Sequence, residues 1–203
     1  HHYAHVNFVG TTNLLELARQ YKVKNFVFAS SSSIYGVNKK IPFSEADSIE
    51  GMISPYAVTK RSAEHLCEFY SRVYGMNIVC LRFFTVYGPR GRPDMAPYMF
   101  MTNIMNGKPI SMYGDGSTKR DYTYISDIVE GVVSSLELGG FEIINLGNNS
   151  PISLKDFISV IEKVTGNRAN IVMKDMQQGD VPLTYADISK AKRLLNYNPK
   201  VNI

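Results

Sequence analysis

The 203-residue sequence lacks several features that would place it outside the globular enzymes and binding proteins. It has no apolar run of the roughly 18 residues that a membrane-spanning helix needs. Its first residues, HHYAHVNF, have neither the basic start nor the apolar core of a secretory signal peptide. The net charge of +4 is spread along the chain without a basic run, which argues against nucleic-acid binding. We therefore expect no membrane and no nucleic-acid partner, and a cytoplasmic location by default.

Cysteine is also scarce. The two residues of this kind, Cys67 and Cys80, lie in apolar segments and do not have the spacing of a metal site. Buried free thiols are the favoured interpretation, because unpaired cysteines are among the most buried residues. No metal is expected. Apolar residues make up 44% of the chain and charged residues 20%, which is ordinary for a globular protein.

The apolar residues that are present alternate between two periods. Residues 5–21 have apolar side chains three and four positions apart, which predicts an amphipathic helix. Residues 25–30 and 77–84 are continuous apolar runs, typical of parallel strands covered on both faces, and the first is expected to be central. Between them, Ser54 as N-cap and Pro55 as first helical residue predict a helix to about Tyr74.

This alternation predicts a doubly wound α/β sheet, in which ligands gather beyond the carboxyl ends of the strands. The segments SSSSIYG and FTVYGPRGRPD follow two such ends. Further helices are predicted at 95–106, at 126–138, from Ser153 with Asp156 in a near capping box, and after Asp187; further strands are predicted at 109–114, 120–125, 142–147 and 170–174.

The segment SPYAVTK contains a candidate for proton transfer. Tyr56 and Lys60 are about one helical turn apart, so both side chains lie on one face of the predicted helix. This spacing alone is common by chance, but the pair begins a helix between two buried strands and follows a serine run. A phenol that exchanges a proton near neutral pH needs a pKa below its usual value of about 10, and a fixed ammonium lowers it.

These motifs, in this order, resemble the extended short-chain dehydrogenase/reductase family. SSSSIYG, SPYAVTK, LRFFTVYGPRGRPDMA and YGDGSTKRDYTYISDI are similar to its NAD-dependent nucleotide-sugar 4-epimerases, in particular those acting on UDP-glucuronate. The resemblance implies NAD as cofactor, a UDP-sugar as substrate, and a homodimer formed through the helix at 5–21 and the Tyr56 helix. It also implies a partial Rossmann-type NAD-binding domain at 1–90, to which 120–150 partly returns, and a smaller α/β substrate-binding lobe at 91–203.

The resemblance also implies roles at the reacting centre. Tyr56 matches the catalytic base, and Lys60 matches its partner, which also holds the nicotinamide ribose. Ser31 matches the active-site hydroxyl, and the Phe84 backbone falls where the family contacts nicotinamide. Asn7 is expected to hydrogen-bond beneath the site.

Further positions match contacts to the substrate. Ser32 and Ser33 are neighbours that could share the work of the active-site serine, and Thr85 occupies a position that faces the sugar. Arg120 corresponds to a ligand of the diphosphate and Asp180 to a contact with the uridine part. The alternatives are structural: serines that satisfy loop backbone groups, Phe84 as a core residue, Asp180 as a turn residue, and a surface ion pair of Arg120 with Asp121 or Asp127.

Arg92 bears on the choice of substrate. Glucuronate epimerases carry an arginine at this point, and a guanidinium binds a carboxylate through two parallel hydrogen bonds. Binding of the carboxylate by Arg92 and Thr85 together would also suppress loss of carbon dioxide from a 4-keto glucuronate. The alternative is a loop ion pair of Arg92 or Arg90 with Asp94, which would leave a neutral UDP-hexose or UDP-N-acetylhexosamine as substrate.

Two further comparisons with the resembled family limit the reaction and the cofactor. Related dehydratases and decarboxylases have acidic residues where this sequence has Ser32, Ser33 and Ile34, so epimerisation is favoured. Family members begin with a Gly-rich phosphate-binding turn, whereas the first 30 residues contain one glycine, Gly10, inside a helical pattern. We therefore expect a fragment that binds NAD weakly by itself. A non-catalytic nucleotide-sugar-binding module stays an alternative.

Overall fold

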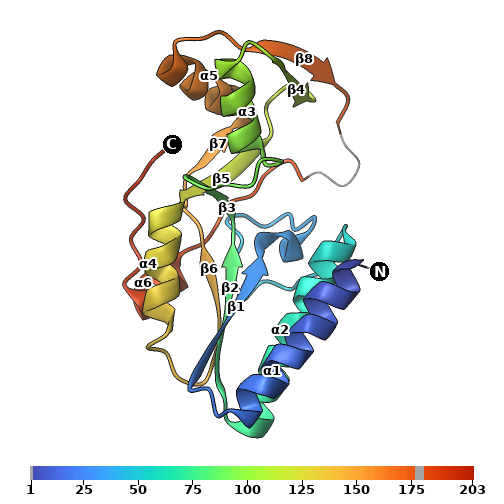
Figure 1. Cartoon of the computed structure of the whole chain (residues 1–203), viewed down its shortest axis with the longest axis vertical. Coiled ribbons are helices and arrows are strands. Elements are labelled where there is room, and N and C mark those ends of the chain that lie inside the picture. The colour runs from blue at the N-terminus through green and yellow to red at the C-terminus, as the bar shows by residue number, and fades with distance from the viewer. Residues whose placement is uncertain (1, 177–180) are drawn as a thin grey trace.

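The computed structural model describes residues 2–176 and 181–203, which form two lobes (Figure 1). The larger lobe contains a parallel sheet of three strands in the order β1-β2-β6: β1 (Asn25–Ser31), β2 (Asn77–Phe83) and β6 (Phe141–Leu146). In β2, five consecutive residues are buried, as expected for a strand covered on both faces. The expectation that the first apolar run is central is wrong within the described residues, because β1 lies at the edge of this sheet.

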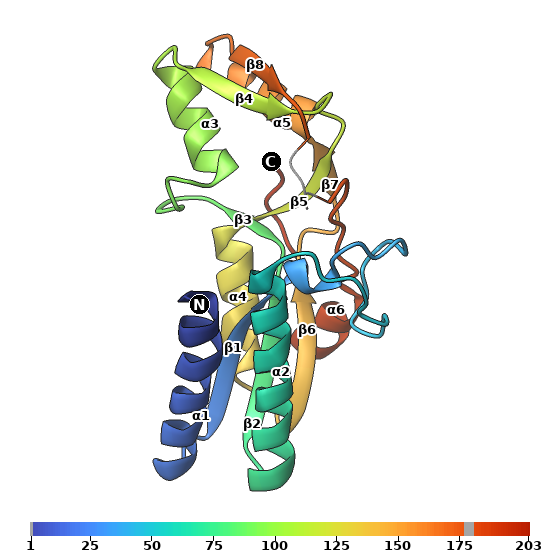
Figure 2. The same ribbon diagram turned by 90° about the vertical axis from the view of Figure 1, so that its right-hand side faces the viewer.

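Helices cover both faces of this sheet, which confirms the predicted doubly wound α/β fold (Figures 1 and 2). One face carries η1 (Ala4–Val9), α1 (Gly10–Gln20) and α2 (Pro55–Tyr74). The other face carries α4 (Ile125–Ser135) and α6 (Ser189–Leu195). The predicted helix at 5–21 is thus continuous in space, but its first part has π-helical hydrogen bonding.

Helix α2 forms as its sequence predicts. The Ser54 hydroxyl accepts a hydrogen bond from the Ala57 amide at 3.1 Å, and Pro55 occupies the first turn. The buried face of α2 packs with α1 and β2 in a cluster that includes the two thiols, Cys67 and Cys80. Both thiols are free and buried, as predicted.

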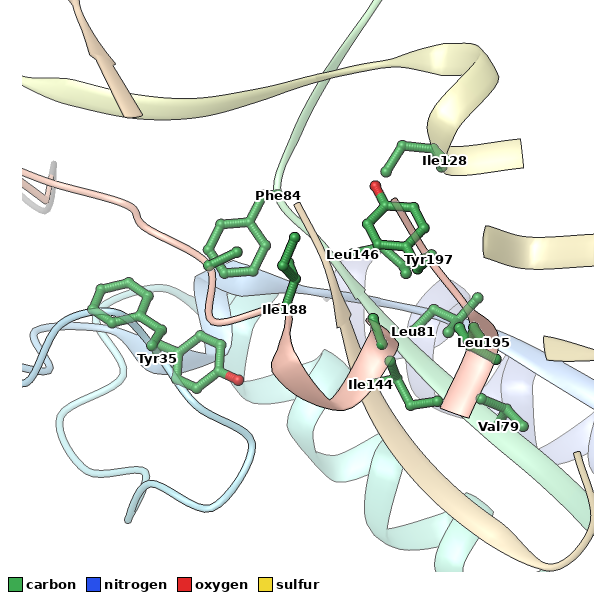
Figure 3. Close-up of a cluster of buried hydrophobic side chains, with 13 residues drawn as sticks. Tyr35, Val79, Leu81, Phe84, Ile128, Ile144, Leu146, Ile188, Leu195 and Tyr197 are labelled. Atoms are coloured by element: carbon green, nitrogen blue, oxygen red, sulfur yellow. The ribbon is translucent and has the colours of Figure 1, made fainter. Parts of the chain in front are cut away.

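A second core cluster lies on the opposite face of the sheet (Figure 3). Leu81 and Leu146 of the sheet pack there against Ile188 and Leu195. Residues near the C-terminus therefore return to the larger lobe. A β-bridge between Phe43 and Ala186 fixes this return.

The smaller lobe is built on a third core cluster and on two short sheets. Its helices are α3 (Ala96–Met105) and α5 (Leu154–Thr165), and its parallel pair is β4 (Pro109–Tyr113) and β8 (Asn170–Lys174). The Ser153 hydroxyl caps α5 by accepting from the Asp156 amide at 3.1 Å. Between the lobes, β5 (Lys119–Tyr124) pairs with β3 (Thr85–Tyr87) and with β7 (Pro151–Ser153), two strands that the sequence did not predict.

Two further features of the fold concern the serine run and the character of the helices. The serine run, expected to be a loop, forms a 3-10 turn, η2 (Ser32–Tyr35). Among the described residues, none of the helices combines the length and the apolar character that crossing a membrane would require.

Candidate functional site

The serine turn forms one wall of the candidate site, at the carboxyl end of β1. Ser31 is buried, and its hydroxyl accepts a hydrogen bond from the Ser33 amide at 3.2 Å and donates to the Ser33 hydroxyl at 3.1 Å. Gly36 ends the turn with φ +54°, and a Cβ at this position would lie 2.4 Å from the Gly51 carbonyl oxygen. The chain therefore needs glycine to leave the turn in this direction.

The first turns of α2 bring Lys60 and Tyr56 beside the end of β1. The Lys60 ammonium donates to the Ala29 carbonyl oxygen at 2.8 Å, and it lies 5.0 Å from the centre of the Phe28 ring and 5.9 Å from that of Tyr56. Burial lowers the pKa of Lys60, because it disfavours the charged form. The Tyr56 ring meets the edge of Tyr3 with 5.6 Å between centres.

Asn7 connects η1 to the same helix. Its side-chain amide donates to the Thr59 hydroxyl at 3.1 Å, and Thr59 donates to the Tyr56 carbonyl oxygen at 2.9 Å. Asn7 thus contacts the residue next to Lys60.

A polar cavity of about 230 Å³ opens where the two lobes meet. Its lining includes four of the sequence-predicted substrate residues: Ser32, Ser33, Thr85 and Arg120. Ile53 and Ser54 of the segment before α2 complete it, together with Val181 and Thr184. The structure thus brings together residues that are far apart in the sequence and supplies hydroxyl groups and a guanidinium to one small space.

Asp121, which follows Arg120 in the sequence, has a structural role, because it holds backbone groups of other segments. Asp121 is fully buried, and its carboxylate accepts the backbone N–H groups of Asn148, Asn149 and Ala186 at 2.8 to 3.1 Å. Burial raises the pKa of Asp121, and these amide donors act against that rise. The Arg120 guanidinium donates to the Lys119 carbonyl oxygen at 2.9 Å. Asp121 therefore ties β5 to the loop after β6 and to the C-terminal segment.

A larger cavity of about 650 Å³ is lined by residues of β3, of the following loop and of α3. Apolar side chains dominate its wall, including Phe84, Val86 and Ile125, and Arg92 is at its edge. Phe84 is also buried in the core, as its structural alternative required.

Arg92 makes the loop ion pair that was the alternative to substrate binding. Its Nε donates to Asp94 at 3.1 Å and its Nη2 at 2.5 Å, and the two side chains are 72% and 64% exposed. Asp94 raises the pKa of Arg92, and Tyr3 and Tyr56 add smaller contributions. Arg92 is therefore within electrostatic reach of Tyr56, and its present partner is at the surface.

A buried ion pair between α2 and β2 is a further feature of this region, and the sequence motifs did not predict it. Glu64 and Arg82 are both about 1% exposed and are joined by two hydrogen bonds of 2.8 Å. One signal for it was in the sequence: arginine inside the apolar run NIVCLRFF implies a buried partner, because an unpaired buried charge is very costly.

One predicted site residue, Asp180, lies outside the described residues. For the rest, the structure gathers a hydroxyl turn, a phenol and an ammonium at the carboxyl end of β1. Ser32 and Ser33 of the turn line the 230 Å³ cavity, whereas Ser31, Tyr56 and Lys60 are not in the lining of either cavity. Such a set can hold an oxygen atom and move its proton.

Comparison with known proteins gives the family. The sequence pattern of the NAD dependent epimerase/dehydratase family matches residues 1–147. The chain belongs to this family.

Individual relatives agree with this assignment. A UDP-glucuronate 4-epimerase of Thermodesulfobacterium geofontis is 46% identical over 99% of this chain and 62% of the relative. The crystal structure of UDP-glucuronic acid 4-epimerase from Bacillus cereus with UDP-glucuronic acid and NAD is 41% identical, with a TM-score of 0.93 over 98% of this chain and 64% of that chain. A Thermotoga maritima UDP-glucose 4-epimerase with UDP-glucose is 34% identical, with a TM-score of 0.94 over 98% of this chain and 66% of that chain. The chain thus spans about three-fifths of the length of the curated relatives that it matches.

Proposed function

We propose that this chain carries the reacting centre of an NAD-dependent UDP-sugar 4-epimerase, most specifically one that converts UDP-glucuronate to UDP-galacturonate. The observation that carries the proposal is the joint position of Tyr56, Lys60 and the Ser31 turn at the carboxyl ends of β1 and β2. Membership of the epimerase/dehydratase family supports the reaction class, and the glucuronate epimerases among the relatives support the substrate.

The residues present are compatible with a bound nicotinamide. The 650 Å³ cavity borders Phe84 and Val86 and offers an apolar wall for a flat ring. The Lys60 ammonium is not in that wall; it lies at the Ala29 carbonyl oxygen and is a donor of the kind that suits ribose hydroxyls. In this proposal, Lys60 and the Phe84 backbone hold the cofactor. NAD, when bound, supplies the chemistry of taking a hydride from sugar C4 and returning it to the opposite face.

Residues of this chain accept and return the proton at the C4 oxygen. Tyr56 as phenolate accepts the hydroxyl proton and later returns it, and the Lys60 ammonium stabilises the phenolate. Ser31 holds the same oxygen through its hydroxyl, with Ser32 and Ser33 beside it. Because hydride must return to the other face, the sugar ring has to turn between the two half-reactions.

A turning ring requires that the nucleotide be held more firmly than the sugar. We assign the nucleotide end to Arg120 in the 230 Å³ cavity and, as a prediction on a residue outside the described ones, to Asp180. Domain roles follow the same division: 1–90 with part of 120–150 faces the cofactor, and 91–203 mainly faces the nucleotide-sugar.

Arg92 is assigned to the substrate carboxylate together with Thr85. This requires the guanidinium to exchange Asp94 for the substrate, and the exchange costs little because solvent and salt screen an exposed ion pair. A UDP-glucose 4-epimerase is also among the structural relatives, so a neutral UDP-hexose is the second candidate.

The test is an assay of the gene product that contains this chain, with NAD and each of UDP-glucuronate, UDP-glucose and UDP-N-acetylglucosamine. We expect interconversion of UDP-glucuronate and UDP-galacturonate, and a loss of roughly 100-fold or more in Tyr56→Phe. Arg92→Leu should impair UDP-glucuronate turnover and spare that of UDP-glucose. Unchanged UDP-glucuronate turnover in Arg92→Leu would refute the carboxylate assignment, and turnover of none of the three sugars would refute the reaction.

The 203-residue chain by itself has a separate test, because the sequence predicts weak cofactor binding. Calorimetric titration with NAD should show no binding at micromolar concentrations. Clear micromolar binding would contradict this prediction without affecting the assigned roles of Tyr56 and Lys60.

A homodimer through α1 and α2 is also proposed. These helices lie side by side on one face of the sheet (Figure 2), and their outer surfaces expose Leu14, Leu17, Val58, Phe69 and Val73. Apolar surface of this kind marks protein interfaces. Sedimentation should show a dimer that Leu14→Glu converts to monomer; a wild-type monomer would refute the proposal.

A further inference from the structure

The buried pair of Glu64 and Arg82 lies between the elements that carry the predicted reacting groups. Glu64 follows Lys60 by four residues on α2, and Arg82 precedes Phe84 by two residues at the end of β2. Burial acts against both charges, but their mutual hydrogen bonds outweigh it, so the pKa of Glu64 is lowered and that of Arg82 is raised. The pair is therefore ionised and rigidly oriented, since its two hydrogen bonds are parallel.

Both ends of the serine turn are attached to this pair. The Ser30 hydroxyl donates to Glu64 Oε1 at 2.6 Å, and Arg82 Nη1 donates to the Tyr35 hydroxyl oxygen at 3.0 Å. The Tyr35 hydroxyl in turn donates to Asn145 Oδ1 at 2.7 Å. Burial raises the pKa of Tyr35 to about 12, so this hydroxyl keeps its proton and remains a donor. The position of Ser31 between these anchors thus depends on Glu64 and Arg82.

The pair also determines what Lys60 contacts. A lysine and a glutamate four residues apart on a helix ordinarily attract each other. Here both Glu64 oxygens are engaged: Oε1 by Ser30 and Arg82, and Oε2 by Arg82 and by Arg61 at 2.9 Å. The Lys60 ammonium points instead to the Ala29 carbonyl oxygen and to the ring of Tyr56.

The electrostatics agree with this geometry. Burial lowers the pKa of Lys60, as expected for an ammonium that lies at a carbonyl oxygen and two aromatic rings. The cations that hydrogen-bond to the Glu64 carboxylate are Arg82 and Arg61.

We propose that Glu64 and Arg82 are positioning residues for the reacting centre: their ion pair keeps the Glu64 carboxylate from capturing Lys60, so that the ammonium faces Tyr56, and it anchors the serine turn beside them. The proposal rests on the proposed function for the roles of Tyr56 and Lys60. Neither residue of the pair is expected to touch the substrate or the cofactor.

The decisive measurement is the titration of Lys60 in the 203-residue chain, followed by ¹³C NMR of lysine labelled at Cε, with the Lys60 signal assigned by its loss in Lys60→Gln. In Arg82→Met the Glu64 carboxylate loses both hydrogen bonds from Arg82, and we expect the pKa of Lys60 to rise. In the double variant Arg82→Met/Glu64→Gln both charges are gone, and we expect the Lys60 titration to return toward that of the wild type.

Tyr56, whose ring lies 5.9 Å from the Lys60 ammonium, Tyr3 against that ring, and Arg61, the next residue of α2, are the same in all these variants. Arg72→Met is the matched control. It also removes one positive charge, but from the Arg72–Glu68 pair of α2, in which the Arg72 side chain is 75% exposed, and it should leave the pKa of Lys60 unchanged. A purely structural role of the pair predicts altered stability but an unaltered Lys60 titration in every folded variant. An unchanged Lys60 pKa in folded Arg82→Met would overturn the proposal.

A second variant covers the case in which Arg82→Met does not fold. Arg82→Lys keeps the charge but loses the planar, two-point contact, so Glu64 is only partly held and the pKa of Lys60 should rise less. No rise in that variant would then overturn the proposal. In the active protein, Arg82→Lys should lower kcat roughly tenfold with little change in KM, as expected for a group that acts through others. Because the titration needs no turnover, it remains decisive even if the proposed reaction is refuted.

Discussion

The two sides of the candidate site are built in different ways. On the side of the larger lobe, Ser30, Glu64 and Arg82 are buried, and hydrogen bonds between their side chains join β1, α2 and β2. On the other side, the Arg92 side chain is 72% exposed on a loop, and every residue of β8 in the smaller lobe is exposed. Groups that move a proton must keep their distances, whereas groups that follow a turning sugar ring must be able to move. The contrast in burial therefore matches the division of labour that the proposed epimerisation needs.

The largest effect that this contrast predicts is the loss of stability when the buried ion pair is broken. Glu64→Ala leaves the Arg82 cation buried without its main partner, and breaking such pairs typically costs about 3 to 5 kcal/mol. The free energy of unfolding, measured by urea denaturation, should fall by that order. Arg82→Met/Glu64→Gln should lose much less, because no unpaired charge remains; equal losses in the two variants would contradict the explanation.

A second prediction compares a core position of the larger lobe with a surface position of the smaller lobe. Leu146 is fully buried in the cluster shown in Figure 3, and Leu146→Ala should destabilise the chain by about 2 to 5 kcal/mol through lost contacts and a residual cavity. Val172 on β8 is 44% exposed, and Val172→Ala should change stability by no more than about 0.5 kcal/mol. Urea unfolding of both variants measures the difference, and similar losses would contradict the difference in burial between Leu146 and Val172.

The sequence was sufficient to predict the parts that depend on local signals. Ser54 and Pro55 predicted the start of α2, and continuous apolar runs predicted β1 and β2. Strands β3 and β7 were missed because each has three residues, too few to show a period, and exists only through pairing with β5.

The same distinction applies to the candidate site. The predicted substrate residues Ser32, Ser33, Thr85 and Arg120 do line one cavity, because their positions follow from strand ends and parallel order. The Glu64 partner of Arg82 could not be identified from spacing, since the contact joins a helix to a strand 18 residues away and depends on packing. The choice of Asp94 as the Arg92 partner likewise depends on the loop conformation.

The smallest predicted effect concerns the segment that closes the larger lobe beside the site. The Glu45 carboxylate accepts a hydrogen bond from the backbone N–H of Asn145 at 2.7 Å. Burial raises the pKa of Glu45, and the Asn145 amide and Lys190 offset this only in part. In the unfolded chain the carboxyl is solvated and ionises first as the pH rises, so the folded state binds more protons within this window.

The contribution of Glu45 to stability should therefore fall as the pH rises from the ordinary carboxyl pKa of about 4.3 through the raised value in the folded state. Glu45→Gln keeps a hydrogen-bond acceptor for Asn145 but does not ionise, so its stability relative to the wild type should improve across that range, by a few tenths of a kcal/mol or somewhat more. Urea unfolding of both proteins at pH 4, 5.5 and 7 tests the sign. A difference that stays constant with pH would mean that Glu45 is solvated in the folded chain, and the larger lobe would then be less tightly closed at this edge than around Glu64 and Arg82.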